Sequence, residues 1–166
     1  MLSRTHRGMV LLFCMAIFCG SLCAQTQKTI TLRMLYARSG KLIATTHFLV
    51  RFNHQKAFIA NTVELNEDGT GKLSLPANAK EITVQATYDS ATETFVNCDS
   101  AATKGYLIDR WYTLSEILAS GVVAPNGCLK PSDAAKLKPT TAKPGEFVFF
   151  VRPRNKHELS QDDSSE

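Results

Sequence analysis

Short runs in which apolar and polar residues alternate recur along the chain, and they constrain its fold more than any other feature. In the run 81–88, Ile82, Val84 and Ala86 fall on one face while Thr83 and Gln85 fall on the other. This period of two is typical of a β-strand with one buried face. Such runs predict strands at 29–36, 45–52, 58–65, 72–75, 81–88, 94–97 and 146–152.

The last of these runs, 146–152, is apolar on both faces and is followed by Pro153. A strand of this kind belongs at the centre of a sheet, because it would promote aggregation at an exposed edge. About seven short strands with turn residues between them predict an all-β fold, an Ig-like or prealbumin-like Greek-key β-sandwich.

The strongest turn signal is the segment 66–71, in which Asp68 and Gly69 lie between two alternating runs. We expect a hairpin turn here. Asn66, Asp68 and Thr70 could instead bind calcium, but the EF-hand spacing would require a glutamate where the chain has Ala77.

The segment 100–143 interrupts the alternation. Thr113 and Glu116 have the spacing of a capping box, and Gly121 is a typical helix stop. We therefore expect one helix of about two turns, with loops at 125–128 and 139–145.

The first 24 residues have the order of a secretory signal peptide. Arg4 and Arg7 precede the apolar run 9–18, and small or polar residues follow up to Ala24. The alternatives are a buried N-terminal helix or a membrane anchor, for which the apolar run is short. We expect cleavage after Ala24 or beside it at Cys23. Lipidation of Cys23 would require a small residue where the chain has Leu22.

Cys98 and Cys128 are the only cysteines outside this segment. In an oxidising compartment two such residues form a disulfide by default, which predicts a closed loop over 98–128. A metal or redox pair is the alternative, and it lacks the close spacing that such sites normally have.

Charge and length limit the remaining possibilities. Removing residues 1–24 lowers the basic residues from 19 to 17, against 15 acidic ones, so the exported part is nearly neutral and nucleic acid is not an expected partner. No second apolar stretch is long enough to span a membrane. We expect a single domain at 25–154 and a disordered polar tail at 155–166.

Residues 39–88 resemble the carboxypeptidase regulatory-like domain, a prealbumin-like (transthyretin-like) β-sandwich. The resemblance lies in the order of five short segments: 39–43, 48–50, 66–69, 73–76 and 84–88. It implies the sandwich fold, and it says little about activity because one sandwich supports many functions. The segment 98–128 is not part of the usual module.

The same resemblance suggests one enzyme, the hydroxyisourate hydrolase branch of the prealbumin fold. That branch has a histidine and arginine site and a Tyr-Arg-Gly-Ser C-terminus, whereas this chain ends in Asp163-Ser164-Ser165-Glu166. The histidines outside the signal are His47, His54 and His157. His47 and His54 would lie on opposite faces of one continuous strand, so they do not predict a shared metal site. No catalytic residue and no cofactor is predicted.

The best binding candidates are Tyr106, Trp111 and Tyr112, which cluster in the segment between the two cysteines. Loops on a rigid sandwich often carry recognition. Alternatively, Trp111 is a core residue that anchors this segment. The predicted function is an exported, non-enzymatic binding or structural module with a protein or glycan partner outside the cytoplasm. A prealbumin-type hydrolase and a subunit of an envelope assembly are the rivals.

We predict that the exported protein begins at or next to Gln25, because the signal peptide should be removed after Ala24. N-terminal sequencing of protein recovered outside the cytoplasm checks this. Exported protein that retains the apolar run 9–18 would contradict it.

Overall fold

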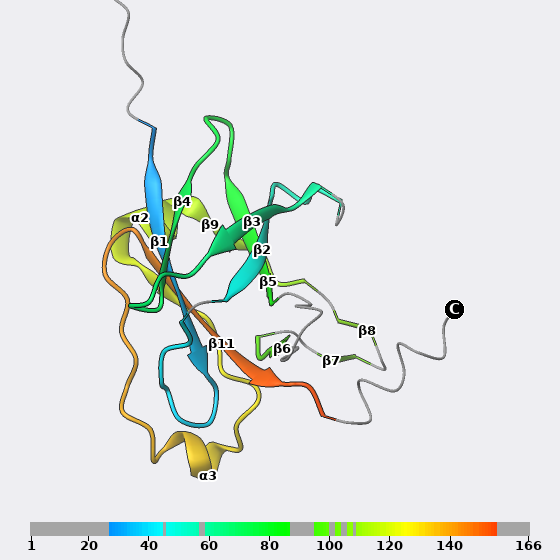
Figure 1. The fold of residues 1–166 in the computed structure, drawn as a ribbon, viewed down its shortest axis with the longest axis vertical. Helices are drawn as coiled ribbons and strands as arrows, with labels where there is room; N and C mark the ends of the chain where they lie inside the picture. The colour runs from blue at the N-terminus through cyan, green and yellow to red at the C-terminus, as the bar shows by residue number, and fades with distance from the viewer. Residues whose placement is uncertain are drawn as a thin grey trace, which may run out of the picture.

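A computed structural model describes residues 27–44, 46–56, 59–86, 95–99, 102–103, 106–107 and 109–155. The predicted signal peptide and most of the predicted polar tail, including His157, lie outside these residues. The described part of the chain forms two main β-sheets that pack face to face, with short helices beside them (Figure 1). The predicted all-β sandwich is confirmed.

The first sheet has the order β10-β11-β1-β4, and β6 also pairs with β11. β1 runs parallel to β11 and antiparallel to β4. The bounds are Thr29–Tyr36 for β1, Thr70–Ser74 for β4, Phe95–Asn97 for β6, Val122–Val123 for β10 and Glu146–Pro153 for β11.

The second sheet has the order β3-β2-β5-β9 and is antiparallel throughout. Its strands are β2 (His47–Phe52), β3 (Asn61–Glu64), β5 (Glu81–Ala86) and β9 (Tyr112–Thr113). A separate pair joins β7 (Ala102–Thr103) to β8 (Tyr106–Leu107). The helices are α2 (Leu114–Ser120) and α3 (Pro131–Ala134). None of the helices in the described ranges is long and apolar enough to cross a membrane.

The main core lies between the two sheets and is built from the inward positions of the alternating runs. Phe48 of β2 and Phe149 of β11 meet edge to face across it, with ring centroids 5.1 Å apart. On the β1 side the inward residues are Ile30, Leu32 and Met34, none more than 1% exposed. The alternation in the sequence therefore reports directly which face of each strand is buried.

The outward face of β11 is buried as well. Val148 and Phe150 form a second cluster with Leu35, Ala37 and Cys98. Cys98 is bonded to Cys128, so the disulfide closes this cluster over the outer face of the first sheet. The predictions of a central final strand and of a Cys98–Cys128 disulfide are both confirmed.

The turn at 66–69 forms, but the strands beside it do not pair as a hairpin. The amide of Gly69 donates to the carbonyl of Asn66 (2.9 Å), and Gly69 has a φ of 71°, which favours glycine. β3 pairs with β2 in one sheet, whereas β4 pairs with β1 in the other. The turn therefore carries the chain from one sheet to the other, and the expected hairpin pairing is wrong.

Helix α2 begins and ends where the sequence indicates, but the predicted capping box does not form. Thr113 makes no side-chain cap hydrogen bond. Thr113 also belongs to β9, and the next amide, that of Leu114, donates to the carbonyl of Lys80 (2.8 Å). At the other end, a Cβ on Gly121 would lie 2.2 Å from the carbonyl oxygen of Lys143, so only glycine allows this close approach.

The segment between the cysteines is anchored to the core by residues other than Trp111. Tyr112, Leu114 and Ile117 belong to the main core, and Ile117 is fully buried. Trp111 is half-buried and lies outside both clusters. The interpretation of Trp111 as a core anchor is therefore corrected: Tyr112, the first residue of β9, enters the core, whereas Trp111 just before the strand does not.

We predict that Ile117→Ala lowers the free energy of unfolding by about 2–5 kcal/mol, because it leaves a cavity in the core. Trp111→Ala should cost only about 1 kcal/mol, since the half-buried indole lies outside both core clusters and its ring contacts are with His54 and Arg51. Urea unfolding of the two variants beside the wild type measures both effects. A loss for Trp111→Ala as large as that for Ile117→Ala would contradict this assignment.

Candidate functional site

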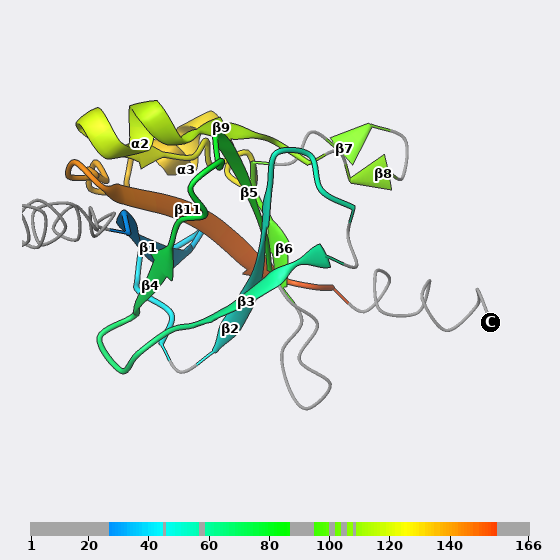
Figure 2. The same ribbon diagram turned by 90° about the horizontal axis from the view of Figure 1, so that it is seen from above.

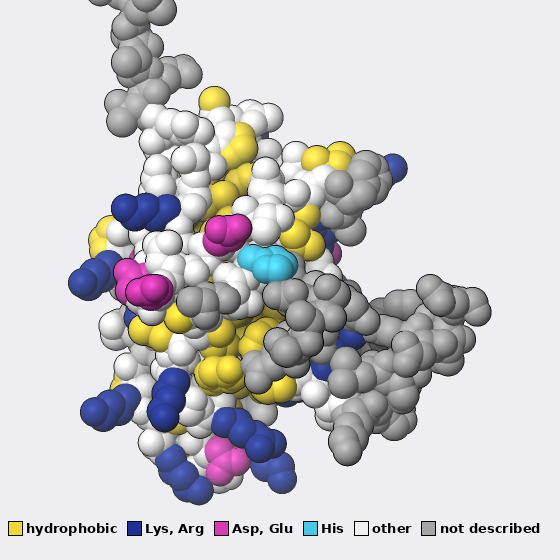
Figure 3. Space-filling model, in the orientation of Figure 1, with side chains coloured by type: hydrophobic (Ala, Val, Ile, Leu, Met, Phe, Trp, Pro, Cys, Tyr) yellow, Lys and Arg dark blue, Asp and Glu magenta, His cyan; other side chains and the backbone are white. Residues whose placement is uncertain are grey.

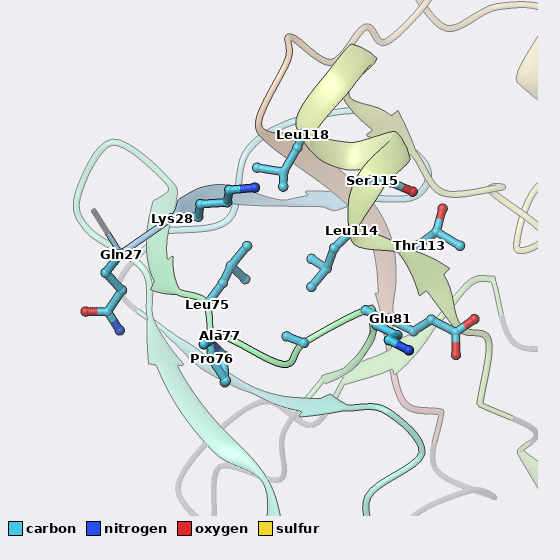
Figure 4. A pocket seen from close by; sticks show the side chains of 12 residues that line it. Gln27, Lys28, Leu75, Pro76, Ala77, Glu81, Thr113, Leu114, Ser115 and Leu118 are labelled. Carbon is cyan, nitrogen blue, oxygen red and sulfur yellow. The ribbon is translucent and has the colours of Figure 1, made fainter. Parts of the chain in front are cut away.

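An open groove of about 1080 Å³ lies in the described surface beside helix α2 (Figure 4). It lies between the end of β4 with the loop that follows it, the start of β1, and helix α2. The residues that line it are Gln27, Lys28, Leu75, Pro76, Ala77, Ala79, Lys80, Glu81, Thr113, Leu114, Ser115 and Leu118.

The groove has an apolar floor and a charged rim. Leu75 and Leu114 are buried at the base, and Leu118 stands half-buried on the α2 side. Lys28 and Lys80 are exposed at the rim, and among the residues that the structure describes neither has a carboxylate partner. Figure 4 shows the side chain of Lys28 extending from the β1 side toward Leu118.

Backbone hydrogen bonds fix the two sides of the groove. The amide of Leu75 donates to the carbonyl of Lys28, and the amide of Leu114 donates to the carbonyl of Lys80, both at 2.8 Å. The first bond holds the end of β4 to the start of β1, and the second holds the start of α2 to the start of β5. The shape of the groove is therefore held by backbone hydrogen bonds and does not require contacts between side chains on its opposite walls.

A tight turn at residues 52–55 brings His54 to the end of the groove. Asn53 and His54 both have positive φ, 48° and 58°, and the amide of Gln55 donates to the carbonyl of Phe52 (2.9 Å). Asparagine and histidine tolerate this conformation better than most residues. The Asn53 side-chain oxygen accepts the amides of Lys80 and Glu81, which ties the turn to the start of β5.

His54 joins the groove to Trp111. Its Nε2 lies 3.0 Å from a carboxylate oxygen of Glu81, a residue that lines the groove. Its ring also lies over the indole of Trp111, with centroids 4.2 Å apart. Trp111 precedes β9 and is half-buried, so the indole lies beside His54 next to the groove and is not part of its lining.

Beneath Trp111 lies a buried arginine. Arg51 is 7% exposed, forms an ion pair with Asp109 and places its guanidinium 5.8 Å from the indole centroid. Arg51 is also the cross-strand partner of Thr83, which is buried on the same outer face. The Arg51–Asp109 pair holds the segment before β9 against the second sheet.

The structure separates the three predicted binding residues. Trp111 is at the surface beside the groove, whereas Tyr112 is in the core, with its ring centroid 4.6 Å from that of Phe147. Tyr106 lies in β8, and its side chain is outside the described residues. Sequence reasoning did not find the groove, because its walls come from three segments that are far apart in the sequence, 27–28, 75–81 and 113–118.

The His54–Glu81 pair resembles the base and orienting carboxylate of a hydrolytic site, in which a nucleophile would lie within hydrogen-bond reach of the base. His54 is largely exposed, and its contacts with described residues are Glu81 and Trp111. Within the described ranges, no hydroxyl or thiol is bonded to it. The hydrogen bond to Glu81 therefore orients the His54 ring at the surface, and in the described residues it does not complete a hydrolytic site.

Asp99 and Tyr112 form a second polar pair, near the disulfide. The Tyr112 hydroxyl donates to Asp99 Oδ2 at 2.6 Å. Burial raises the pKa of Asp99, although the hydrogen bond from Tyr112 and the nearby Arg110 act in the opposite direction. Burial and the neighbouring carboxylate raise the pKa of Tyr112.

We predict that Asp99 makes the protein less stable as the pH rises. Because the pKa of Asp99 is raised in the folded state, the folded chain keeps this proton at pH values where the unfolded chain has lost it. The contribution of Asp99 to the free energy of unfolding therefore falls as the pH increases through the folded pKa. Asp99→Asn removes this titration and can still accept the Tyr112 hydrogen bond. Relative to the wild type, the variant should gain stability as the pH rises above about 4, the usual pKa of an aspartate carboxyl. Parallel urea titrations would refute this if the difference between the two proteins did not change with pH.

A second hollow, of about 700 Å³, lies over the first sheet near the segment 136–143. Its walls carry Arg33, Lys136, Lys138 and Lys143, and Figure 3 shows basic side chains gathered at this end of the molecule. Arg33 is paired with Glu146 at 2.7 Å, and Lys136 lies 3.3 Å from Asp133. Part of this positive charge is therefore already compensated.

Comparison with known proteins gives no relative: no family model matches the chain, and no significant match was found among curated proteins or solved structures. The function has to be argued from the geometry of the groove and its surroundings.

Proposed function

We propose that this protein is an exported binding module and that its ligand occupies the groove between β4, β1 and α2. The observation that carries the proposal is the combination of an apolar floor and exposed charged residues in one preformed hollow. Ligand sites in proteins commonly have this composition, with a few polar groups that orient an otherwise apolar contact.

Export is supported by two features. The order of charge, apolar run and small residues at 1–24 is that of a signal peptide. The Cys98–Cys128 disulfide is typical of proteins that work in an oxidising compartment. A binding role is preferred over hydrolysis because His54 has a carboxylate partner but, in the described part of the chain, no nucleophile bonded to it.

The proposed fold family is the carboxypeptidase regulatory-like, prealbumin-like sandwich. The two-sheet architecture and the turn at 66–69 support it. A Greek-key connection is part of the same proposal: β1 and β4 are neighbours in one sheet, whereas β2 and β3, which lie between them in sequence, pair in the other.

We predict that Ser115→Trp blocks the groove without unfolding the protein, because Ser115 is exposed on α2 and lines the hollow. Ala119→Trp is the matched control, on the same helix but outside the lining. The measurement is a screen of small neutral apolar fragments by ¹H–¹⁵N shift perturbation. Wild type and Ala119→Trp should show shifts at Leu75, Thr113 and Leu118, and Ser115→Trp should lose them.

Fragments that shift residues elsewhere and leave these amides unchanged would refute the groove as the binding site. If Ser115→Trp is poorly folded in a thermal melt, Ala77→Trp serves the same purpose. Ala77 is exposed on the opposite wall, away from the helix.

A further inference from the structure

We infer that the ligand of the groove is a free single-chain anionic amphiphile, with an apolar chain and a carboxylate-like head. This inference rests on the binding role proposed above and adds the chemical class of the ligand. It follows from the floor of the groove, from the charge of its rim and from the hydrogen bonds that its backbone has already made.

The floor favours an aliphatic group. Leu75, Leu114 and Leu118 present branched aliphatic side chains, and Pro76, Ala77 and Ala79 extend the apolar surface on one side. Covering such surface with an aliphatic chain removes apolar area from water and so favours binding. Of the described residues in the lining, none carries an aromatic ring, whereas sugar recognition relies on stacking against aromatic faces. A glycan is therefore a poor match for the groove itself.

The rim favours an anion. Lys28 and Lys80 contribute two positive charges without a carboxylate partner in the described ranges. The one acidic residue of the lining, Glu81, is engaged by His54 at 3.0 Å. An anionic head group at this rim would be complementary to the lysine charge, whereas a cationic head group would be repelled.

Two backbone amides of the lining are not available to a peptide that adds a strand. Such a ligand binds through unpaired amides and carbonyls along a sheet edge. At this groove the amides of Leu75 and Leu114 already donate to the carbonyls of Lys28 and Lys80. At these two positions recognition falls to side chains, as it would for a small amphiphile with one head group.

Isothermal titration calorimetry of the exported protein with decanoate tests the inference, with decyltrimethylammonium as the cationic probe of equal chain length. Decanoate should bind once per chain, with a negative heat-capacity change, and at least about tenfold more tightly than the cation. Equal affinities for the two probes, or no binding of decanoate, would overturn the inference.

The lysines are tested by the double variant Lys28→Gln/Lys80→Gln, which should weaken decanoate binding by about tenfold, since each exposed ion pair contributes modestly. Lys138→Gln is the matched control: it removes one lysine from the second hollow and should leave the affinity unchanged. An equal loss in both variants would refute the role of the groove lysines.

The two proposals fail in different ways. If neutral fragments bind the groove but decanoate is not preferred over the cation, the binding role stands and the ligand class is wrong. If neither probe nor any fragment perturbs the groove, both are wrong. Retention on vesicles of anionic lipid without binding of free decanoate would assign the groove to a membrane surface and overturn the inference.

Discussion

The pairing of β11 with β1 is the interaction on which the rest of the structure depends. β11 places Phe147 and Phe149 in the core between the sheets and Val148 and Phe150 in the second cluster outside them. Fully burying each of these side chains is worth about 1.5–3 kcal/mol, so one strand stabilises both layers. Figure 2 shows β11 extending along the molecule between β1 and the layer that contains the helices.

The same strand positions the groove. At its start, the amide of Gly145 donates to the carbonyl of Ile117 (2.8 Å), which joins the beginning of β11 to the end of α2. Ile117 in turn fills the core below the helix, so that Leu118 is held beside the apolar floor. The groove is therefore shaped by the main core, and the side chains at its rim can change without altering its walls.

Local patterns in the sequence predict the strands well, because burial follows the period of two. The two-sided apolar run at 146–152 also predicts a central strand, and the two cysteines outside the first 24 residues predict the disulfide. The partner of each strand is not encoded locally: the turn at Gly69 has hairpin residues, yet it connects different sheets. Trp111 was misjudged for a similar reason. Trp111 lies just before β9, and a strand of two residues gives no alternation from which its burial could be predicted.

The parallel pairing of β1 with β11 also affects how the chain folds. Arg33 and Glu146, which form an ion pair across these strands, are 113 positions apart in the sequence. Contacts of such long range make folding slow. Neither cluster can close until Glu146–Pro153 has been synthesised, so the nascent chain lacks its central strand for most of its synthesis. If the protein is exported as we propose, a core that cannot close before its last strand is made is compatible with threading of an unfolded polypeptide through a translocation channel.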